Sequence, residues 1–154
     1  MKEKSPLLDA NNSPVCINFN IRKASRAVSQ HFDNIMQPTG LRGTQFSILG
    51  ILTLKGVVNI CDLAEAMVMD RTTLTRNLKP LEKNGLLTIR AGQEDRRVRE
   101  IHLTDEGRET FKTALPYWRT AQKSLVGEVG EDVLHALISN LESVVQASSK
   151  LKRD

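Results

Sequence analysis

The chain has 154 residues, of which 26% are charged and 40% hydrophobic, and its formal net charge at pH 7 is +4. This size suits one globular domain with its own core, and no run reaches the roughly 18 apolar residues that a membrane span needs. The N-terminus lacks the apolar core of a signal peptide, and Cys16 and Cys61 match no zinc-ligand spacing. We therefore expect a cytoplasmic protein without a bound metal, cofactor or membrane.

The N-terminal third of the chain is predicted to hold a tail and two helices. Residues 1–14 are polar and contain two prolines, which predicts a mobile tail. Apolar residues at three- and four-residue spacing predict a helix over about 15–36, which Pro38 and Gly40 end, and a second helix over about 43–54.

Two shorter helices follow, each with its own capping residue. Asn59 is expected to cap the first and Asp70 the second, which Asn84 and Gly85 end. Pro80 lies inside the second helix and removes one backbone hydrogen bond, which predicts a kink or local loosening there. The residues expected to face the core are Leu63, Ala64, Met67, Leu74, Leu78 and Leu81.

The remaining chain is predicted to form a hairpin and two helices. Alternating residues predict strands over 86–90 and 98–103, joined by a polar loop. Thr104 is expected to cap a helix that runs to about residue 126 with an interruption near Pro116, and a last helix covers about 131–149. The predicted fold is mainly α with a small β-hairpin, and its central part is typical of a winged helix-turn-helix.

Positive charge gathers on the second capped helix and the hairpin. Residues 71–99 hold eight basic and three acidic side chains, a net charge of +5 against +4 for the whole chain. Such a concentration is typical of a surface that binds phosphate groups. This segment is therefore the first place to look for function.

The outward side of the helix after Asp70 carries side chains suited to base edges. Arginine can contact guanine through two hydrogen bonds, and threonine offers a hydroxyl and a methyl group. The alternative is an ordinary solvated helix face, but the basic hairpin that follows directly favours DNA contact. The candidate DNA-binding residues of this helix are Arg71, Thr72, Thr73, Thr75, Arg76 and Lys79.

The tip of the predicted hairpin, residues 93–97, has its own set of candidates. An arginine on a narrow projecting loop can enter the minor groove, where the potential is negative. Asp95 would repel phosphate, so we expect it to orient an arginine of the hairpin or of the preceding helix through a charge-assisted bond. A flexible charged turn is the alternative interpretation.

Four motifs of this region resemble one known family. They are Asn-Ile-Cys-Asp-Leu-Ala-Glu-Ala-Met (59–67), Thr-Thr-Leu-Thr-Arg-Asn-Leu (72–78), Leu-Glu-Lys-Asn-Gly-Leu-Leu (81–87), and Glu-Asp-Arg-Arg (94–97) followed by Ile-His-Leu-Thr-Asp-Glu-Gly (101–107). They are similar to the core of the MarR (multiple antibiotic resistance regulator) family of winged helix-turn-helix transcription factors. The likeness extends over about residues 15–148, and the departures from it are Arg42, where a Ser or Thr usually caps the helix, and Pro80.

The resemblance implies a domain plan and roles for three hairpin residues. Residues 15–40 and 104–149 would form interdigitated dimerisation helices, and residues 41–103 the DNA-binding region of the same intertwined domain. Arg96 would enter the minor groove, while Asp95 and Arg97 would brace the wing or contact phosphate. The wide apolar faces of the terminal helices independently favour a two-fold partner.

The candidate sensing residues lie outside the basic segment. Cys16 resembles the redox-active cysteine in the peroxide-sensing branch of the family, although a buried structural cysteine is the favoured interpretation. Tyr117 and Trp118 could line a pocket for a phenolic or lipophilic effector or pack at the dimer interface. Cys61 is expected in the core. The histidines, His31, His102 and His135, are expected to be structural.

The sequence therefore predicts a transcriptional regulator and not an enzyme. It is expected to bind pseudo-palindromic duplex DNA as a homodimer, to repress, and to be released by a small ligand. Two alternatives remain: a thiol-based redox regulator of the same fold that uses Cys16, and a winged-helix interaction module that does not bind DNA.

Overall fold

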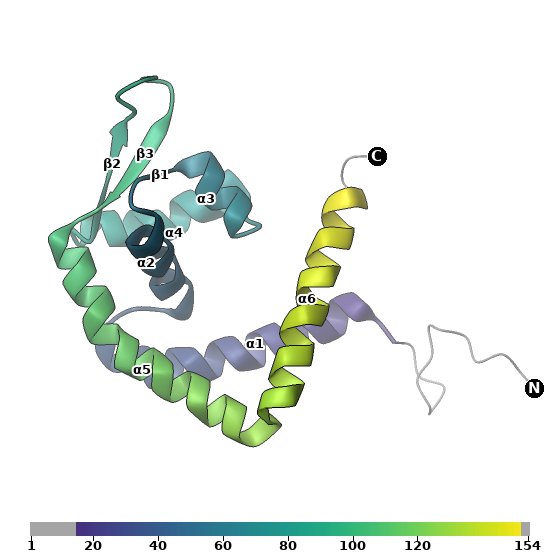
Figure 1. The fold of residues 1–154 in the computed structure, drawn as a ribbon. Helices are drawn as coiled ribbons and strands as arrows, with labels where there is room; N and C mark the ends of the chain where they lie inside the picture. Colours follow the sequence, from purple (N-terminus) through teal and green to yellow (C-terminus); the bar gives the residue numbers. More distant parts are fainter. Residues whose placement is uncertain (1–14, 152–154) are drawn as a thin grey trace, which may run out of the picture.

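A computed structural model describes residues 15–151, so the predicted tail over 1–14 lies outside the described residues. Figure 1 shows a hairpin projecting from a group of short helices, with longer helices below. Within the described range no helix is long and apolar enough to cross a membrane. The elements are α1 (Ile17–Met36), η1 (Gln37–Thr39), α2 (Gly43–Lys55), β1 (Val58–Asn59), α3 (Ile60–Ala66), α4 (Arg71–Lys83), β2 (Leu87–Ala91), β3 (Arg99–Leu103), α5 (Asp105–Val129) and α6 (Glu131–Leu151).

The predicted helices and hairpin strands are confirmed within a few residues, but two predictions need correction. α5 continues through Pro116 without interruption and ends at Val129, not near residue 126. A proline removes a single donor, and buried Ala114 and Ala121 hold the helix against its neighbours on either side of it. α4 ends at Lys83, before Asn84 and Gly85 as predicted, with Pro80 inside it.

The strand that sequence reasoning missed is β1, which has only two residues. Val58 pairs with Ile101 and Asn59 with Glu100, so the antiparallel sheet has the order β1-β3-β2. Two residues are too few for an alternating pattern to be recognised, and their pairing depends on β3, about 40 residues later. The small sheet anchors the hairpin to the start of α3.

The core lies between the short helices and the base of the hairpin. As predicted, the leucine stripe of α4 is buried, and Leu63 and Ala64 face inward from α3. Cys61 was expected beside them, but it is exposed. It lies two residues before Leu63, which on a helix points it to a different side. The largest fully buried side chains are Met36, Ile48, Leu49, Leu52, Leu63, Leu74, Leu78, Leu81, Leu87 and Ile101.

A compact junction joins the end of α4, the start of β2 and the start of α5. The Thr104 hydroxyl donates to the Gly85 carbonyl oxygen at 2.7 Å and accepts from the Gly107 backbone N–H at 3.0 Å. A side chain at Gly107 would collide with the Leu86 carbonyl oxygen and lie 2.7 Å from Leu103 Cδ1. We call Gly85, Leu86, Thr104 and Gly107 the α4–α5 junction.

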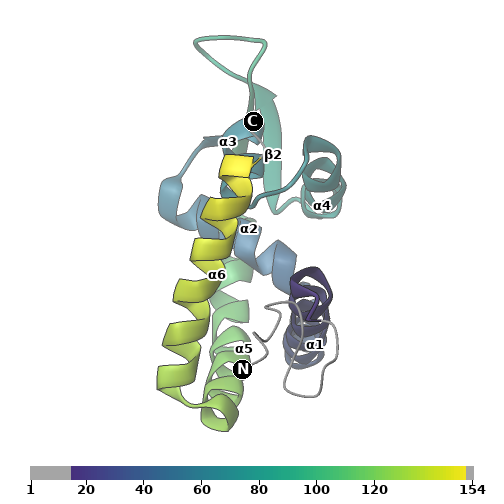
Figure 2. The ribbon, with the colours of Figure 1, turned by 90° about the vertical axis from the view of Figure 1, so that its right-hand side faces the viewer.

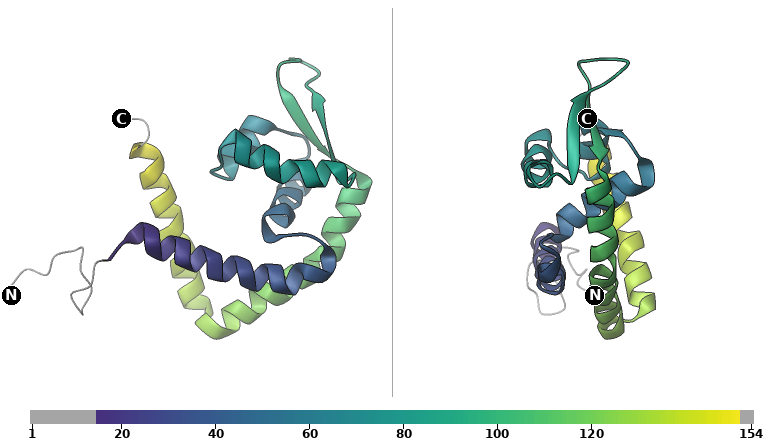
Figure 3. Two further views of the ribbon diagram at one scale, coloured as in Figure 1. Left: turned by 180° about the vertical axis from the view of Figure 1, so that it is seen from behind. Right: turned by 90° about the vertical axis from the view of Figure 1, so that its left-hand side faces the viewer.

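The long helices extend away from this junction. α5 runs from the hairpin down to the turn that begins α6, and α1 crosses α5 (Figure 3). His31 on α1 contacts the Ala121 carbonyl oxygen at 3.1 Å and the Ser124 hydroxyl at 3.0 Å on α5, which agrees with the structural role expected for this histidine. α6 begins at the end of α5 and diverges from it (Figure 1), and in the side view the hairpin projects beyond the helices (Figure 2).

We predict that Gly107→Ala lowers the free energy of unfolding by about 3 kcal/mol, because the new methyl group forces Leu86 and Leu103 apart. The matched control is Gly127→Ala on the same helix, where nothing lies within 4 Å of the new Cβ. That control is expected to raise stability by about 0.5–1 kcal/mol through helix propensity. Urea denaturation at one protein concentration measures both, and equal effects of the two changes would contradict the packing described for the junction.

Candidate nucleic-acid interface

The start of α4 is fixed by Asp70, as the sequence predicted. Asp70 Oδ1 accepts from the Thr73 backbone N–H at 2.8 Å, and Asp70 Oδ2 accepts from the Thr73 hydroxyl at 2.6 Å. These two bonds hold the pKa of Asp70 below its ordinary value, so the cap stays ionised. With Leu74 and Leu78 buried on the inner side, the opposite side of α4 must face outward.

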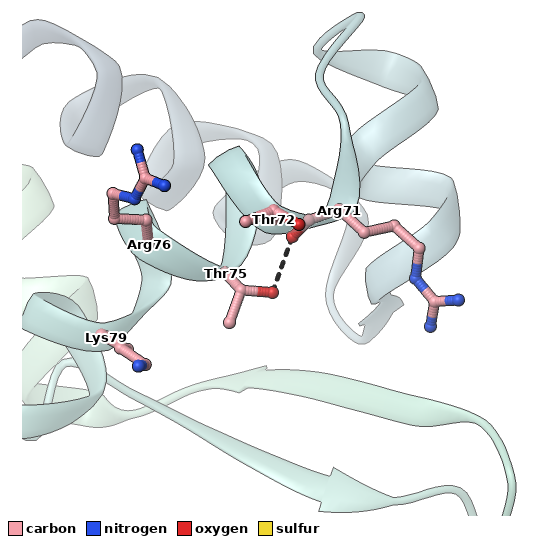
Figure 4. Close-up of a pocket in the computed structure, with 5 residues that line it drawn as sticks. All are labelled: Arg71, Thr72, Thr75, Arg76 and Lys79. Atoms are coloured by element: carbon pink, nitrogen blue, oxygen red, sulfur yellow. Dashed lines mark hydrogen bonds between the residues drawn. The ribbon is translucent and has the colours of Figure 1, made fainter.

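The outward side of α4 lines an open groove of about 400 Å³ (Figure 4). Its lining residues are Arg71, Thr72, Thr75, Arg76 and Lys79, five of the six candidates on this helix. The Thr75 hydroxyl donates to the Arg71 carbonyl oxygen at 2.7 Å, which leaves its oxygen lone pairs and methyl group outward. The sixth candidate, Thr73, is partly buried and bonded to Asp70. Its hydroxyl is therefore part of the N-cap of α4 and is not directed outward like the other five.

The hairpin, hereafter the wing, is held against α4 and braced at its tip. The Ile89 backbone N–H donates to Glu82 Oε1 at 3.2 Å, which links β2 to α4. At the tip, Asp95 Oδ1 accepts from the Arg97 backbone N–H at 2.9 Å and lies 3.7 Å from Arg97 Nε. Asp95 thus pairs with an arginine of the wing. Among the described residues, no ion pair involves the neighbouring Arg96.

All eight basic side chains of residues 71–99 are exposed. α4 and the wing are joined through Glu82, and we define their outward, basic side as the reading surface. Arg99 was counted in the charge of this segment but was not singled out as a candidate. In the sequence, only its positive charge points to a role in binding. Its position beside α3 depends on the pairing of β1 with β3.

The two aromatic candidates lie in different surroundings. Trp118 stacks on Phe46 with ring centroids 5.8 Å apart and lines a cleft of about 360 Å³ between α1, α2, α4 and α5. Arg42 and Asn77 also line this cleft, and neither was singled out as a candidate for an effector site. Tyr117, with 39% of its surface exposed, does not line it.

Cys16 lies apart from both the reading surface and the cleft. It is the N-cap of α1, where its sulfur accepts from the Phe19 backbone N–H at 3.4 Å, and it is exposed in this chain instead of buried as favoured. His102 lies 3.4 Å from Glu100 Oε2 on β3, and His135 is exposed on α6. The structure therefore brings the DNA-contact candidates together and leaves the sensing candidates separate.

Known proteins with the same architecture include solved complexes with DNA. The chain is 35% identical to the M. tuberculosis transcriptional regulator MosR in complex with DNA, over 87% of this chain and 98% of that one, with a TM-score of 0.76. It is 27% identical to the transcriptional repressor CouR bound to a 23-mer DNA duplex, over 84% and 92% of the two chains, with a TM-score of 0.77.

Curated sequences give a similar result over shorter segments. YdgJ of Bacillus subtilis, an HTH-type transcriptional regulator, is 28% identical over 103 residues, 67% of this chain and 63% of YdgJ. For the regulator Hpr of Halalkalibacterium halodurans, the match is 29% identical and covers 66% of this chain but only 53% of Hpr. The chain thus spans less than two thirds of the length of these two relatives.

The MarR family model matches residues 41–98, which include α2 to α4 and most of the wing. The match contains the capped α4, its basic outward side and the braced tip of the wing. With the 35% identity to MosR over nearly the whole of that protein, these features identify the chain as a member of the MarR family of winged helix-turn-helix, DNA-binding transcriptional regulators.

Proposed function

We propose that the protein is a homodimeric repressor that binds pseudo-palindromic operators sequence-specifically and is released by a small phenolic or lipophilic ligand. The observation that carries this proposal is the reading surface, on which eight exposed basic side chains face outward from α4 and the wing. Lysine and arginine at such a density neutralise DNA phosphates and release bound counterions.

The two parts of the reading surface suit the two grooves of a duplex. A helix the width of α4 fits the major groove, where Arg76 could bond a guanine edge and Thr75 could contact a thymine methyl group. The projecting wing suits the minor groove, into which Arg96 would extend while Asp95 holds Arg97. The solved complexes of MosR and CouR with DNA support DNA as the partner of this surface.

A two-fold partner is supported by apolar side chains that this chain leaves uncovered. No residue of α6 is buried, and Ile17 and Phe19 on α1 are 63% and 58% exposed. Uncovered apolar surface on this scale marks an interface. We assign residues 15–40 and 104–149 to dimerisation and 41–103 to DNA binding. The exposed apolar residues of α6 include Val133, Leu137, Ile138, Leu141 and Val145.

Relatives of this chain include both a repressor and an activator of transcription. CouR is a transcriptional repressor, whereas BadR of Rhodopseudomonas palustris, 28% identical over 127 residues, is a transcriptional activatory protein. We favour repression because a dimer that occupies its operator excludes other proteins without any further contact surface. The 27% identity to CouR extends over 84% of this chain, which supports the same choice.

The cleft beside Trp118 is where we place the ligand. Trp118, Val28 and Phe32 offer apolar contact, and Arg42 offers a cation for a phenolate or carboxylate group. Asn77 lies on α4 and lines the cleft, with its side-chain N–H donating to the Thr73 carbonyl oxygen one turn earlier at 2.9 Å. A ligand seated there would push on α4 and on α5 together, which would change the spacing of the two reading surfaces in a dimer.

A thiol switch at Cys16 is the second candidate for the signal. The exposed sulfur caps α1 directly before the uncovered Ile17 and Phe19. Oxidation to a sulfenic acid would place a polar group at the edge of the proposed dimer interface.

A relative supports the ligand and not the thiol. DNA binding of BpsR of Bordetella bronchiseptica, which has the same fold, is regulated by 6-hydroxynicotinic acid, so this fold accommodates a small-molecule signal.

The first prediction for this function separates base contacts from charge contacts. Arg76→Ala should weaken binding to a duplex selected from a random library by about 1–3 kcal/mol, with little effect on unrelated duplex. Arg96→Ala should weaken both and reduce the slope of log affinity against log salt by about 1, because one cation no longer neutralises a phosphate. Fluorescence anisotropy at two salt concentrations measures each.

The matched control is Arg119→Ala on α5, which removes an exposed arginine outside the reading surface and should leave affinity unchanged. Equal weakening by all three variants would mean that overall charge and not the reading surface binds DNA. Absence of salt-dependent duplex binding by the parent protein would favour the interaction module that does not bind DNA.

The second prediction concerns the signal. Trp118 is the only tryptophan, so its fluorescence reports directly on the cleft, and salicylate should quench it and release DNA over the same concentration range. Arg42→Ala should weaken salicylate binding about tenfold by removing the cation, a loss of about 1.4 kcal/mol. Lys55→Ala, at the far end of α2, should have no effect.

A parallel assay with organic hydroperoxide distinguishes the two signals. Cys16→Ser should respond to salicylate like the parent protein, since the thiol lies outside the cleft. If hydroperoxide releases the parent from DNA and spares Cys16→Ser, while salicylate has no effect, the thiol switch replaces the ligand proposal.

A further inference from the structure

A pocket of about 330 Å³ lies between α3, the first residue of α4 and the start of β3, at the tip end of the wing. Cys61 and Asp62 line it from α3, Arg71 from α4, and Arg97 and Arg99 from the wing. These residues are far apart in sequence, and the pairing of β1 with β3 brings them to one place. The pocket is distinct from the groove along α4, with which it shares only Arg71.

The pocket is strongly cationic. Three guanidinium groups line it against one carboxylate, and Asp62 Oδ2 already accepts from Asn59 Nδ2 at 2.6 Å. Arg99 has a single long bond, from Nη2 to the Ile89 carbonyl oxygen at 3.4 Å, so most of its donors remain available. A planar guanidinium presents parallel donors that match the oxygens of a phosphate group.

The position of the pocket indicates which phosphate of the DNA backbone would lie in it. If α4 enters the major groove and the wing the adjacent minor groove, the sugar-phosphate strand that separates the two grooves must pass between them. The start of α4 and the residues that lead into β3 are two walls of this pocket. The strand would therefore cross directly over the three arginines.

We propose that this pocket holds a phosphate group of the DNA backbone, gripped by Arg71, Arg97 and Arg99. The inference rests on the proposed DNA-binding function and deepens it, because it assigns a position to one backbone contact and a role to Arg99. The contact fixes the register of α4 against the wing, since it is made by both at once. It carries no base specificity.

Cys61 supplies a reporter for the pocket. Its thiol is exposed and lines the pocket, so a bound backbone would cover it. In the Cys16→Ser protein Cys61 is the only thiol, and iodoacetamide adds a neutral group that leaves the charge of the pocket unchanged. We expect saturating duplex to slow alkylation of Cys61 at least tenfold, and millimolar inorganic phosphate to slow it less than twofold.

Arginine variants of the Cys16→Ser protein test the proposed contacts with the phosphate group. Arg99→Ala should reduce the slope of log affinity against log salt by about 0.9 for each phosphate that it leaves without a cation. In the presence of duplex, it should also return the alkylation rate of Cys61 to at least half of the rate without duplex. Arg119→Ala is the matched control, because it removes an exposed arginine that lies outside the reading surface and does not line the pocket. It should keep the tenfold protection of Cys61.

The outcomes separate the pocket from the function as a whole. Full-affinity duplex binding with unchanged alkylation of Cys61 would overturn the pocket and leave the proposed function standing. Equal protection by inorganic phosphate would assign the pocket to a free anion and would also overturn the inference. Absence of duplex binding by the Cys16→Ser protein and the parent alike would overturn both.

Discussion

The close packing of Gly107 against the Leu86 carbonyl oxygen is the constraint on which the reading surface depends. At this point the end of α4, both ends of the wing and the start of α5 meet, and the Thr104 hydroxyl bonds to two of the joined segments. Only a residue without a side chain permits this approach. As a result, α4 and the wing keep a fixed orientation toward α5 and move with it.

Under the proposed function, this coupling would give α5 a role in regulation as well as in assembly. Phe46 of α2 stacks on Phe111 and Trp118 of α5, with centroids 4.8 Å and 5.8 Å away, so the winged part is held to α5 at the junction and again along the helix. The cleft beside Trp118 opens next to the second of these attachments. A ligand there would act on a rigid body held at two places, and a change in its tilt would be carried to the tip of the wing.

Most of the fold could be predicted because its signals are local. The leucine stripe of α4 and the caps at Asn59 and Asp70 involve residues within four positions of each other. β1, the exposure of Cys61 and the place of Arg99 depend on a strand pairing across about 40 residues, which no local pattern contains. The uninterrupted α5 at Pro116 shows tertiary packing prevailing over a local preference.

We propose the outward face of α4 and the wing as the surface that meets DNA. Arginine modification by phenylglyoxal, read by mass spectrometry with and without a selected duplex, tests it within one sample. We expect DNA to protect Arg71, Arg76, Arg96, Arg97 and Arg99, and to leave the modification of Arg22, Arg26 and Arg119 on α1 and α5 unchanged. Protection confined to the arginines of α1 and α5 would contradict it.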